Sequence, residues 1–394
     1  MARIPEEWKL SPSQHLEIFT NEIAPREILP HVHRQTPNPG SSITNTSNKR
    51  PPLAIIIVGQ TGAGKTRLAP DLLQAMNNNL TTSSSSSSSN NNPPIPQAAG
   101  NSSSTSESEP VQVGKGIAHL IADTYKTYHP HYTTALSSSN PQLASPLTSP
   151  TARQWLKMAC HLCTSHKIPV LLESACRHPD DFVQLASIFH SKGYTVLVAI
   201  LAVPSALSRL GILVRYYKDL PEARSGQLPL RLTPKKVHDE SYKGLEQAAE
   251  WVDTNPEGAV DAVVVVRRGG ALAYTNRRRR RKTHAQHVNS SIREEEEEEV
   301  SRRWEKEQQQ QPGGALRALI HERTRQLSTE ELETARKDIE ALEGLQHVKV
   351  DEEDIRQIGE LLSSLGREQQ ALPELDEVFD ASRFVTENYI YSDQ

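Results

Sequence analysis

The feature that most constrains this chain is a glycine-rich octapeptide that directly follows an apolar run. Leu53 to Val58 are all apolar and rich in Ile, which is typical of a buried parallel strand. Leu68 to Leu73 follow the octapeptide with leucines at helical spacing. The octapeptide matches G-x-x-x-x-G-K-[ST] and reads Gly59-Gln60-Thr61-Gly62-Ala63-Gly64-Lys65-Thr66. A strand, this motif and a helix in that order predict a phosphate-binding loop.

Each part of this loop has a physical reason to hold a nucleotide. Its glycines let successive backbone N–H groups and the helix N-terminus point at phosphate oxygens. We expect Lys65 to neutralise charge on the β- and γ-phosphates and the Thr66 hydroxyl to ligate Mg²⁺. All eight residues are therefore predicted to bind a nucleotide cofactor together with Mg²⁺. The loop alone does not distinguish a kinase from a GTPase, a motor or a transporter ATPase.

Further apolar runs alternate with helical patterns along the chain. They are Ile117 to Ala122, Ile168 to Leu172, Thr195 to Val203 and Ala262 to Val266. Such alternation is typical of a parallel sheet with helices on both faces. The predicted fold class is α/β, a three-layer P-loop NTPase-type domain with a mostly parallel sheet, disordered insertions and a helical C-terminal extension.

Two acidic residues directly follow strands of the predicted sheet. Asp123 follows the second apolar run, and Glu173 follows the third, with Arg177 four residues later. Open α/β sheets bind ligands at the carboxyl ends of their strands, so both acids are candidates for chemistry on a substrate hydroxyl. Each acid taken alone could instead be an ordinary helix-start charge.

Arginines flank a stretch rich in Pro and Gly, Leu220 to Pro229, which we interpret as a mobile lid. Arg215 and Arg231 lie on either side of it, and arginine suits the charge on a transferring phosphoryl group. Arg209 and Arg224 lie nearby, and spacing alone does not choose among the four.

The composition indicates that polar segments dilute a single catalytic-sized domain. Hydrophobic residues make up 36% of the chain, below the level usual for a fully globular chain, and the net charge of -4 favours neither nucleic acid nor anionic membranes. We expect residues 1–50 to form an N-terminal helix, capped near Ser11 and ended near Pro25, followed by a polar linker. A P-loop domain is expected over 51–275, with a disordered low-complexity insertion at 77–110. A charged and Gln-rich disordered linker at 276–313 and a helical extension at 314–394 complete the organisation.

The three cysteines are too few for a disulfide scaffold, and Met1 to Leu10 contain no apolar segment typical of a signal peptide. Cys160 and Cys163 lie in a helical pattern, so we interpret them as buried and reduced, because no second such pair completes a metal site. We expect a cytoplasmic protein with no membrane partner. The basic run Arg277 to Lys282 leaves a nuclear location open, although a solvated linker is the preferred interpretation.

Five ordered blocks of this sequence resemble the zeta-toxin family, P-loop kinases whose bacterial members phosphorylate UDP-N-acetylglucosamine. The resemblance extends over roughly Leu53 to Tyr274 outside the Ser-rich insertion. The blocks are Gly59 to Thr66, Ile121 to Tyr132, Val170 to Pro179, Leu201 to Tyr216 and Leu230 to Glu240.

The resemblance implies a role for each candidate residue. Asp123 is the base on the sugar hydroxyl, and Glu173 and Arg177 contact the nucleotide-sugar side. Lys65 and Thr66 act on ATP and Mg²⁺. Arg215 and Arg231 clamp the ATP phosphates.

Two departures from the family pattern concern the acceptor side. The family segment typically reads Glu-Gly-Thr-Gly-Arg, whereas Ala175 stands here in place of the Thr, with Ser174 as the neighbouring hydroxyl. The family also uses a carboxylate on the preceding helix, yet Thr151 to Lys167 contain no Asp or Glu. We therefore expect intact phosphate handling and an altered acceptor preference.

The preferred hypothesis is a kinase that transfers the γ-phosphoryl group of ATP to a hydroxyl of a small molecule, a nucleotide sugar such as UDP-N-acetylglucosamine. One alternative is another P-loop phosphotransferase, such as a nucleic-acid end kinase. A second alternative is an ATP-binding interaction protein in which catalysis is vestigial. Phosphate transfer to an acceptor distinguishes the first hypothesis from the second alternative.

Overall fold

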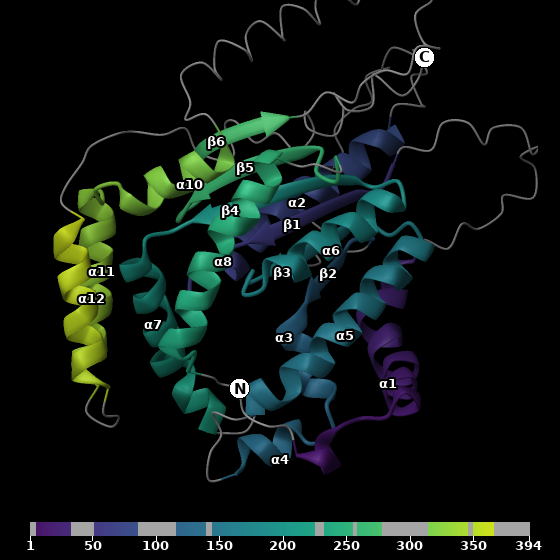
Figure 1. Cartoon of the computed structure of the whole chain (residues 1–394), viewed down its shortest axis with the longest axis horizontal. Helices are drawn as coiled ribbons and strands as arrows, with labels where there is room; N and C mark the ends of the chain where they lie inside the picture. Colours follow the sequence, from purple (N-terminus) through teal and green to yellow (C-terminus); the bar gives the residue numbers. More distant parts are fainter. Residues whose placement is uncertain are drawn as a thin grey trace, which may run out of the picture.

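A six-stranded sheet forms the centre of the molecule (Figure 1). The computed structural model describes residues 5–32, 51–85, 116–138, 144–224, 232–254, 258–277, 314–345 and 350–365. Within them the strand order is β2-β3-β1-β4-β5-β6. The strands are β1 (Leu53–Val58), β2 (Ala118–Ile121), β3 (Val170–Ser174), β4 (Thr195–Ala202), β5 (Ala262–Arg267) and β6 (Leu272–Arg277).

The sheet is mostly parallel, as the sequence predicts. β1 lies between β3 and β4, both parallel to it, and β2 and β5 extend the parallel part on either side. All five predicted apolar runs form strands. The sixth strand, β6, was not predicted; it pairs antiparallel with β5 after a turn at Gly269 and Gly270, both with positive φ. This strand also extends to Arg277, inside the segment predicted as a linker.

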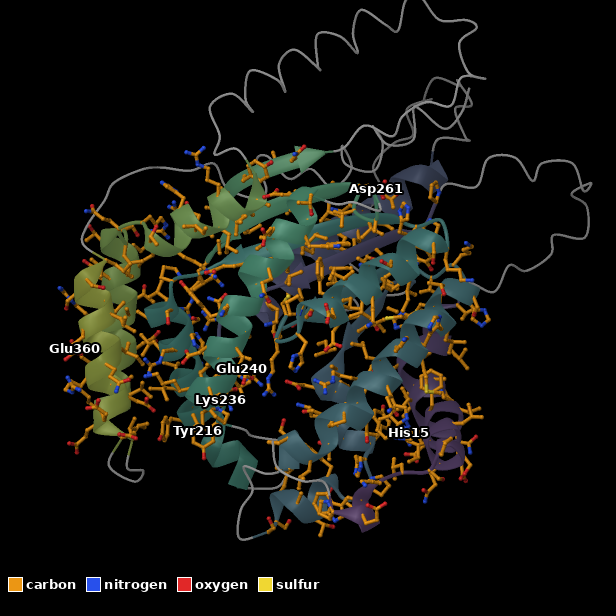
Figure 2. All side chains as sticks on the ribbon, in the orientation of Figure 1. His15, Tyr216, Lys236, Glu240, Asp261 and Glu360 are labelled. Carbon is orange, nitrogen blue, oxygen red and sulfur yellow. The ribbon has the colours of Figure 1, made fainter. Side chains whose placement is uncertain are left out.

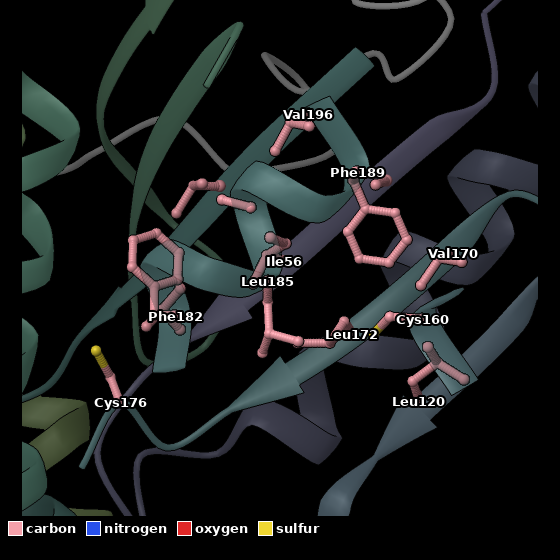
Figure 3. Close-up of a cluster of buried hydrophobic side chains, with 14 of the residues drawn as sticks. Ile56, Leu120, Cys160, Val170, Leu172, Cys176, Phe182, Leu185, Phe189 and Val196 are labelled. Carbon is pink, nitrogen blue, oxygen red and sulfur yellow. The ribbon is translucent and has the colours of Figure 1, made fainter. Parts of the chain in front are cut away.

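Helices cover both faces of the sheet, which gives the predicted three layers. The helices within the domain are α2 (Lys65–Ser85), α3 (Ala122–Tyr125), α4 (Tyr132–Leu136), α5 (Ala144–Ser165), α6 (Pro179–Ser191), α7 (Ser205–Arg224) and α8 (Lys235–Thr254). Ile56 of β1 faces one core, with Trp155 of α5 and Phe182 of α6, and Figure 3 shows part of this core. The next residue, Ile57, faces the other core, which contains Leu72 of α2. The alternation along β1 thus separates two apolar layers.

The N-terminal segment packs against the core beside α5. Ser11 caps α1 (Pro12–Ile18) in a reciprocal capping box with Gln14, as expected for a serine at this position. The prediction that the helix ends near Pro25 is wrong, because a π-helical segment continues over Phe19–Ile28. Pro25 has no backbone N–H to donate, which would interrupt the hydrogen bonds of an α-helix. In the π-helical segment the hydrogen bonds join residues five positions apart, so a different set of backbone groups is paired around the proline.

Two helices continue into segments that were predicted to be non-helical. α2 continues through Asn77, where the insertion was expected to begin, and ends at Ser85. α7 ends at Arg224, so the first part of the predicted lid from Leu220 is helical. The rest of that lid, residues 86–110 of the predicted insertion and most of the predicted linker at 276–313 lie outside the described residues.

Three helices follow in the C-terminal extension, as the periodicity predicts. They are α10 (Ala315–Thr324), α11 (Thr329–Glu343) and α12 (Glu352–Ser364). α10 packs against α8 and the sheet, while α11 and α12 pack against α7 (Figure 1). All three cysteines are buried, which confirms the interpretation of Cys160 and Cys163 as core residues. Among the described residues, no helix combines the length and apolar character needed to cross a membrane.

Candidate active site

The glycine-rich loop lies at the carboxyl end of β1 and packs closely against α7. Gly62 has a φ of +81°, and a Cβ atom there would lie 1.9 Å from the Ser208 carbonyl oxygen. Only glycine combines this backbone conformation with this close approach. The loop is therefore fixed between β1 and the first turns of α7.

Glu173 lies beside the start of the helix that follows the loop. Its position on β3 pairs with Ile57 of β1, the next-to-last residue before the loop begins at Gly59. The Thr66 hydroxyl donates to Glu173 Oε2 at 3.4 Å, and His119 Nε2 lies 3.0 Å from Oε1. Glu173 is buried, so these two contacts orient a carboxylate that has little access to water.

Lys65 lies over the loop, with its ammonium group close to several charges. Lys65 Nζ donates to the carbonyl oxygens of Gly59 at 2.8 Å and Gln60 at 3.2 Å. Burial lowers the pKa of Lys65 from its ordinary value, and the charges of Glu173 and Asp123 oppose that shift. The three groups predicted from separate sequence blocks therefore lie close enough to interact electrostatically.

Asp123 follows β2 in the first turn of α3, and its side chain is exposed. Lys126 Nζ contacts its carboxylate and donates to Ser145 Oγ of α5 at 2.7 Å. Because Lys126 is buried, it holds a positive charge at a fixed place beside Asp123. Such a neighbour favours the ionised carboxylate.

A pocket of roughly 210 Å³ opens beside these groups. Asp123 and Glu173 line one part of it, and the loop Ser174 to His178 after β3 lines another. α5 contributes Ser149, Arg153, Leu156 and Lys157, and α6 contributes Asp181, Gln184, Leu185 and Ile188. The sheet edge and two helices thus form a concave site that carries groups of both charges, and small-molecule sites are typically concave.

The loop after β3 is held by packing and by its own hydrogen bonds. Cys176 has a φ of 49°, and its N–H donates to Ser174 Oγ at 3.2 Å. A Cβ at Gly244 of α8 would lie 2.2 Å from the Cys176 carbonyl oxygen, so only glycine, which has no side chain, fits at this position of α8. Burial raises the pKa of Cys176 to about 12, which makes its thiol inert in this position.

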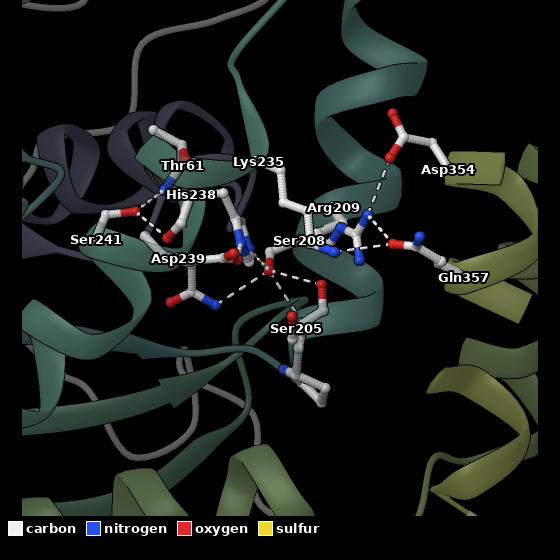
Figure 4. Close-up of polar contacts among 12 residues, drawn as sticks. Thr61, Ser205, Ser208, Arg209, Lys235, His238, Asp239, Ser241, Asp354 and Gln357 are labelled. Atoms are coloured by element: carbon white, nitrogen blue, oxygen red, sulfur yellow. Dashed lines mark hydrogen bonds and ion pairs between the residues drawn. The ribbon is translucent and has the colours of Figure 1, made fainter. Parts of the chain in front are cut away.

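A buried polar network supports the phosphate loop from behind. Gln60 Nε2 donates to the Val203 carbonyl at 2.6 Å, and its Oε1 accepts from Arg323 Nη2 at 3.1 Å. Ser208 Oγ lies 2.8 Å from His238 Nε2, and the Thr61 N–H donates to Ser241 Oγ at 3.3 Å. Figure 4 shows that α7 and α8 carry most of these partners. Residues far apart in the sequence therefore fix the loop.

The candidate arginines lie in different surroundings. Arg177 Nε donates to Glu240 Oε2 of α8 at 2.5 Å (Glu240 is labelled in Figure 2). Arg215 is exposed on α7, and its charge lowers the pKa of Lys65, which places it within electrostatic reach of the loop. Arg209 instead forms an ion pair with Asp354 of α12 at 3.0 Å. Arg231 lies outside the described residues, so the geometry brings together only part of the predicted clamp.

The sequence reasoning missed His119, Ser241 and Arg323. His119 occupies an inner position of a short apolar strand, and a lone polar residue in such a run was the available signal. Ser241 and Arg323 lie on helices that carry no recognisable motif. Ser241 contacts Thr61 across 180 positions of the chain, and Arg323 contacts Gln60 across 263 positions. No local sequence pattern can predict contacts over such separations.

Known proteins match this chain both in sequence and in structure. A family model described as Zeta toxin matches residues 40–83 and 97–279, which include the loop, Asp123 and Glu173. Two curated relatives are named Toxin zeta, one from Enterococcus hirae and one from Streptococcus pyogenes. Each is 27% identical over 126 residues, and the match covers 31% of this chain but only 42% of the relative's length.

A solved structure shares the fold. It comes from the PezAT chromosomal toxin-antitoxin system of Streptococcus pneumoniae and superposes with a TM-score of 0.53. The superposition covers 86% of this chain and 99% of that chain at 15% sequence identity. The family model matches more than half of the chain, with the phosphate loop and both acidic strand ends inside the matched residues. The chain therefore belongs to the zeta toxin family.

Proposed function

We propose that this chain is an ATP- and Mg²⁺-dependent kinase that transfers the γ-phosphoryl group of ATP to a hydroxyl of a small molecule. The observation that carries the proposal is the convergence of the phosphate loop, Asp123 and Glu173 at the carboxyl ends of adjacent strands β1, β2 and β3. This is the edge of an open α/β sheet where ligands bind. Membership of the zeta toxin family, which implies a P-loop kinase, supports the same reaction.

The residues around Thr66 fit the ATP side of such a site. A hydroxyl and a carboxylate lie together at Thr66 and Glu173, and oxygens of these two kinds are ligands that Mg²⁺ prefers. Bound Mg²⁺ would neutralise charge on the phosphate oxygens. We expect Lys65 to bind the β- and γ-phosphates, and the charge of Arg215 on α7, which acts on Lys65, would add to the same neutralisation.

Asp123 fits the role of the base on the acceptor. Its carboxylate lines the pocket beside the loop and is exposed, so a hydroxyl can reach it. The carboxylate is held in contact with the Lys126 amine, and a carboxylate so oriented can act as a general base on a hydroxyl. Transfer then depends on holding the hydroxyl in line with the phosphate, together with charge neutralisation by Lys65.

The acceptor class proposed for this chain is a nucleotide sugar. The resemblance to kinases of UDP-N-acetylglucosamine supports it, as does the position of Arg177 on the pocket wall. Ala175 also lines the pocket, where the family pattern has a Thr. We therefore propose that UDP-N-acetylglucosamine itself is a poor acceptor and that a related nucleotide sugar or hydroxyl compound is preferred.

The test is an incubation of the full chain with γ-labelled ATP, MgCl2 and a panel of nucleotide sugars, followed by mass spectrometry of the products. We expect one acceptor to gain a phosphoryl group at a rate far above that of any other. ATP binding without transfer to any acceptor would contradict the proposal and favour a binding protein with vestigial catalysis. Transfer only to oligonucleotide ends would favour a nucleic-acid kinase.

A further inference from the structure

Two cations on α5 line the pocket. Arg153 and Lys157 lie one helical turn apart and are both exposed. In the part of the chain that the structure describes, neither forms a hydrogen bond or an ion pair with a carboxylate. Two unneutralised positive charges therefore face the same concave site.

The other charged groups of the pocket are already accounted for. Lys126 contacts Asp123, and Arg177 is paired with Glu240 of α8. Glu173 is held by Thr66 and His119. Asp181 lies in the first turn of α6, where the helix N-terminus stabilises a negative charge. The excess positive charge of the pocket is therefore on the α5 wall.

The spacing of this pair argues against a purely structural role. Like charges at positions i and i+4 repel each other on a helix surface and destabilise it. An anion held between the two side chains would turn this repulsion into attraction. An Arg guanidinium and a Lys ammonium are the usual binding groups for phosphate and carboxylate.

We propose that Arg153 and Lys157 bind an anionic group, phosphate or carboxylate, on the acceptor molecule while its hydroxyl lies at Asp123. This inference rests on the proposed kinase function for the identity of the ligand, but the subsite itself is defined by the pocket. It narrows the acceptor to a hydroxyl compound that carries a negative charge on the part held by α5. A neutral acceptor of the same shape would lose both contacts.

A binding measurement tests the subsite without turnover. The phosphate loop is saturated with Mg²⁺ and a non-hydrolysable ATP analogue, and inorganic phosphate or acetate is titrated in a calorimeter. The Arg153→Gln/Lys157→Gln variant should bind the anion at least 10-fold more weakly than the wild type. The Arg336→Gln/Lys337→Gln variant is the matched control, because that Arg and Lys are exposed on α11 away from the pocket. It should bind as the wild type does.

The two probes distinguish the sources of the anion. Tighter binding of phosphate than of acetate supports a phosphorylated acceptor, and the reverse supports a carboxylic acid. No binding of either probe to the wild type, or equal binding by all three proteins, would overturn the inference. The melting temperature of the pocket variant should equal or exceed that of the wild type, because the substitution removes a repulsion.

Kinetics separate this inference from the proposed function. With an acceptor from the panel, the pocket variant should show a KM for that acceptor raised at least 10-fold and a KM for ATP within about 2-fold of the wild type. Phosphate transfer that is indifferent to Arg153 and Lys157 would leave the kinase proposal standing and overturn the subsite. Anion binding at Arg153 and Lys157 without phosphate transfer to any acceptor would leave the subsite standing and overturn the kinase proposal.

Discussion

Lys65 is the residue on which the ATP side of the site depends most. Its ammonium group lies within reach of the loop carbonyls, of Glu173 and of Asp123. Backbone N–H groups of the loop remain when the side chain is removed, but they cannot supply its full charge. Its role can therefore be tested by removing that charge.

We expect Lys65→Ala to raise the Kd for ATP by tens-fold, in line with the value of a group that binds phosphate charge. Calorimetric titration with ATP and MgCl2 measures this directly. Lys192→Ala is a suitable control, because Lys192 is exposed at the end of α6. An unchanged Kd for ATP in Lys65→Ala would show that this loop does not bind the nucleotide.

Ala175 is the residue at which the acceptor side departs from the family pattern. Within the described residues, the neighbouring Ser174 Oγ accepts from the Cys176 N–H, and both Ser174 and Ala175 line the pocket. Ala175→Thr should improve kcat/KM for UDP-N-acetylglucosamine by several-fold, because one restored hydrogen bond contributes about 1 kcal/mol. Steady-state kinetics on that sugar provide the measurement. A strong wild-type activity that Ala175→Thr leaves unchanged would show that the substitution is compensated elsewhere.

At the scale of elements, helix α10 connects the C-terminal extension to the phosphate loop. Arg323 donates to Gln60 in the loop, pairs with Glu246 of α8 at 3.0 Å and stacks on the Tyr242 ring at 3.6 Å. Arg323 is 3% exposed, and burial lowers its pKa from the ordinary arginine value. A charge kept in such a place stabilises the fold only as long as its partners remain.

Arg323→Gln should lower the free energy of unfolding by about 1–3 kcal/mol and weaken ATP binding several-fold, because Gln60 and Glu246 lose their partner. Urea unfolding and calorimetry measure the two effects. Arg317→Gln provides the control, since Arg317 is exposed on the same helix. Equal ATP affinity in both variants would show that α10 stabilises the fold without supporting the loop.

The elements that the sequence predicted are those with strong local patterns. β1 and the loop after it are recognisable because the apolar run and the glycines lie together in the chain. β6 was missed although Gly269 and Gly270 offered a turn signal, because Leu272 to Arg277 alternate only weakly. Arg323 was not predictable at all, because its partners lie on other elements and the pairing depends on tertiary packing.

At the scale of the whole molecule, the N-terminal segment buries a histidine that titrates far from its ordinary range. His129 is 2% exposed, and its ring lies 6.4 Å from those of Trp8 and Trp155. Burial lowers the pKa of His129 to about 4, and the nearby His131 acts in the same direction. The unfolded chain therefore binds a proton at a pH where the folded chain does not.

Stability should accordingly fall as the pH drops from about 6.5 toward 4, because protonation favours the unfolded state over that range. The full effect of His129 is about 3 kcal/mol at 1.36 kcal/mol for each unit between the two pKa values. His129→Phe should remove most of this dependence, measured as urea unfolding at pH 7 and pH 5. His161→Asn, exposed on α5, should leave it unchanged. An equal loss of stability in His129→Phe would assign the acid sensitivity to other groups.

The central claim is that this molecule performs phosphoryl transfer at Asp123, and Asp123→Asn tests it most directly. The amide keeps the shape of the side chain but cannot accept the acceptor proton. We expect kcat for transfer to the best acceptor to fall by about 10²-fold or more, while the Kd for ATP stays within a few-fold of the wild type. Weak ATP binding with normal turnover at saturation would instead make Asp123 a metal-binding or structural residue and would contradict the account.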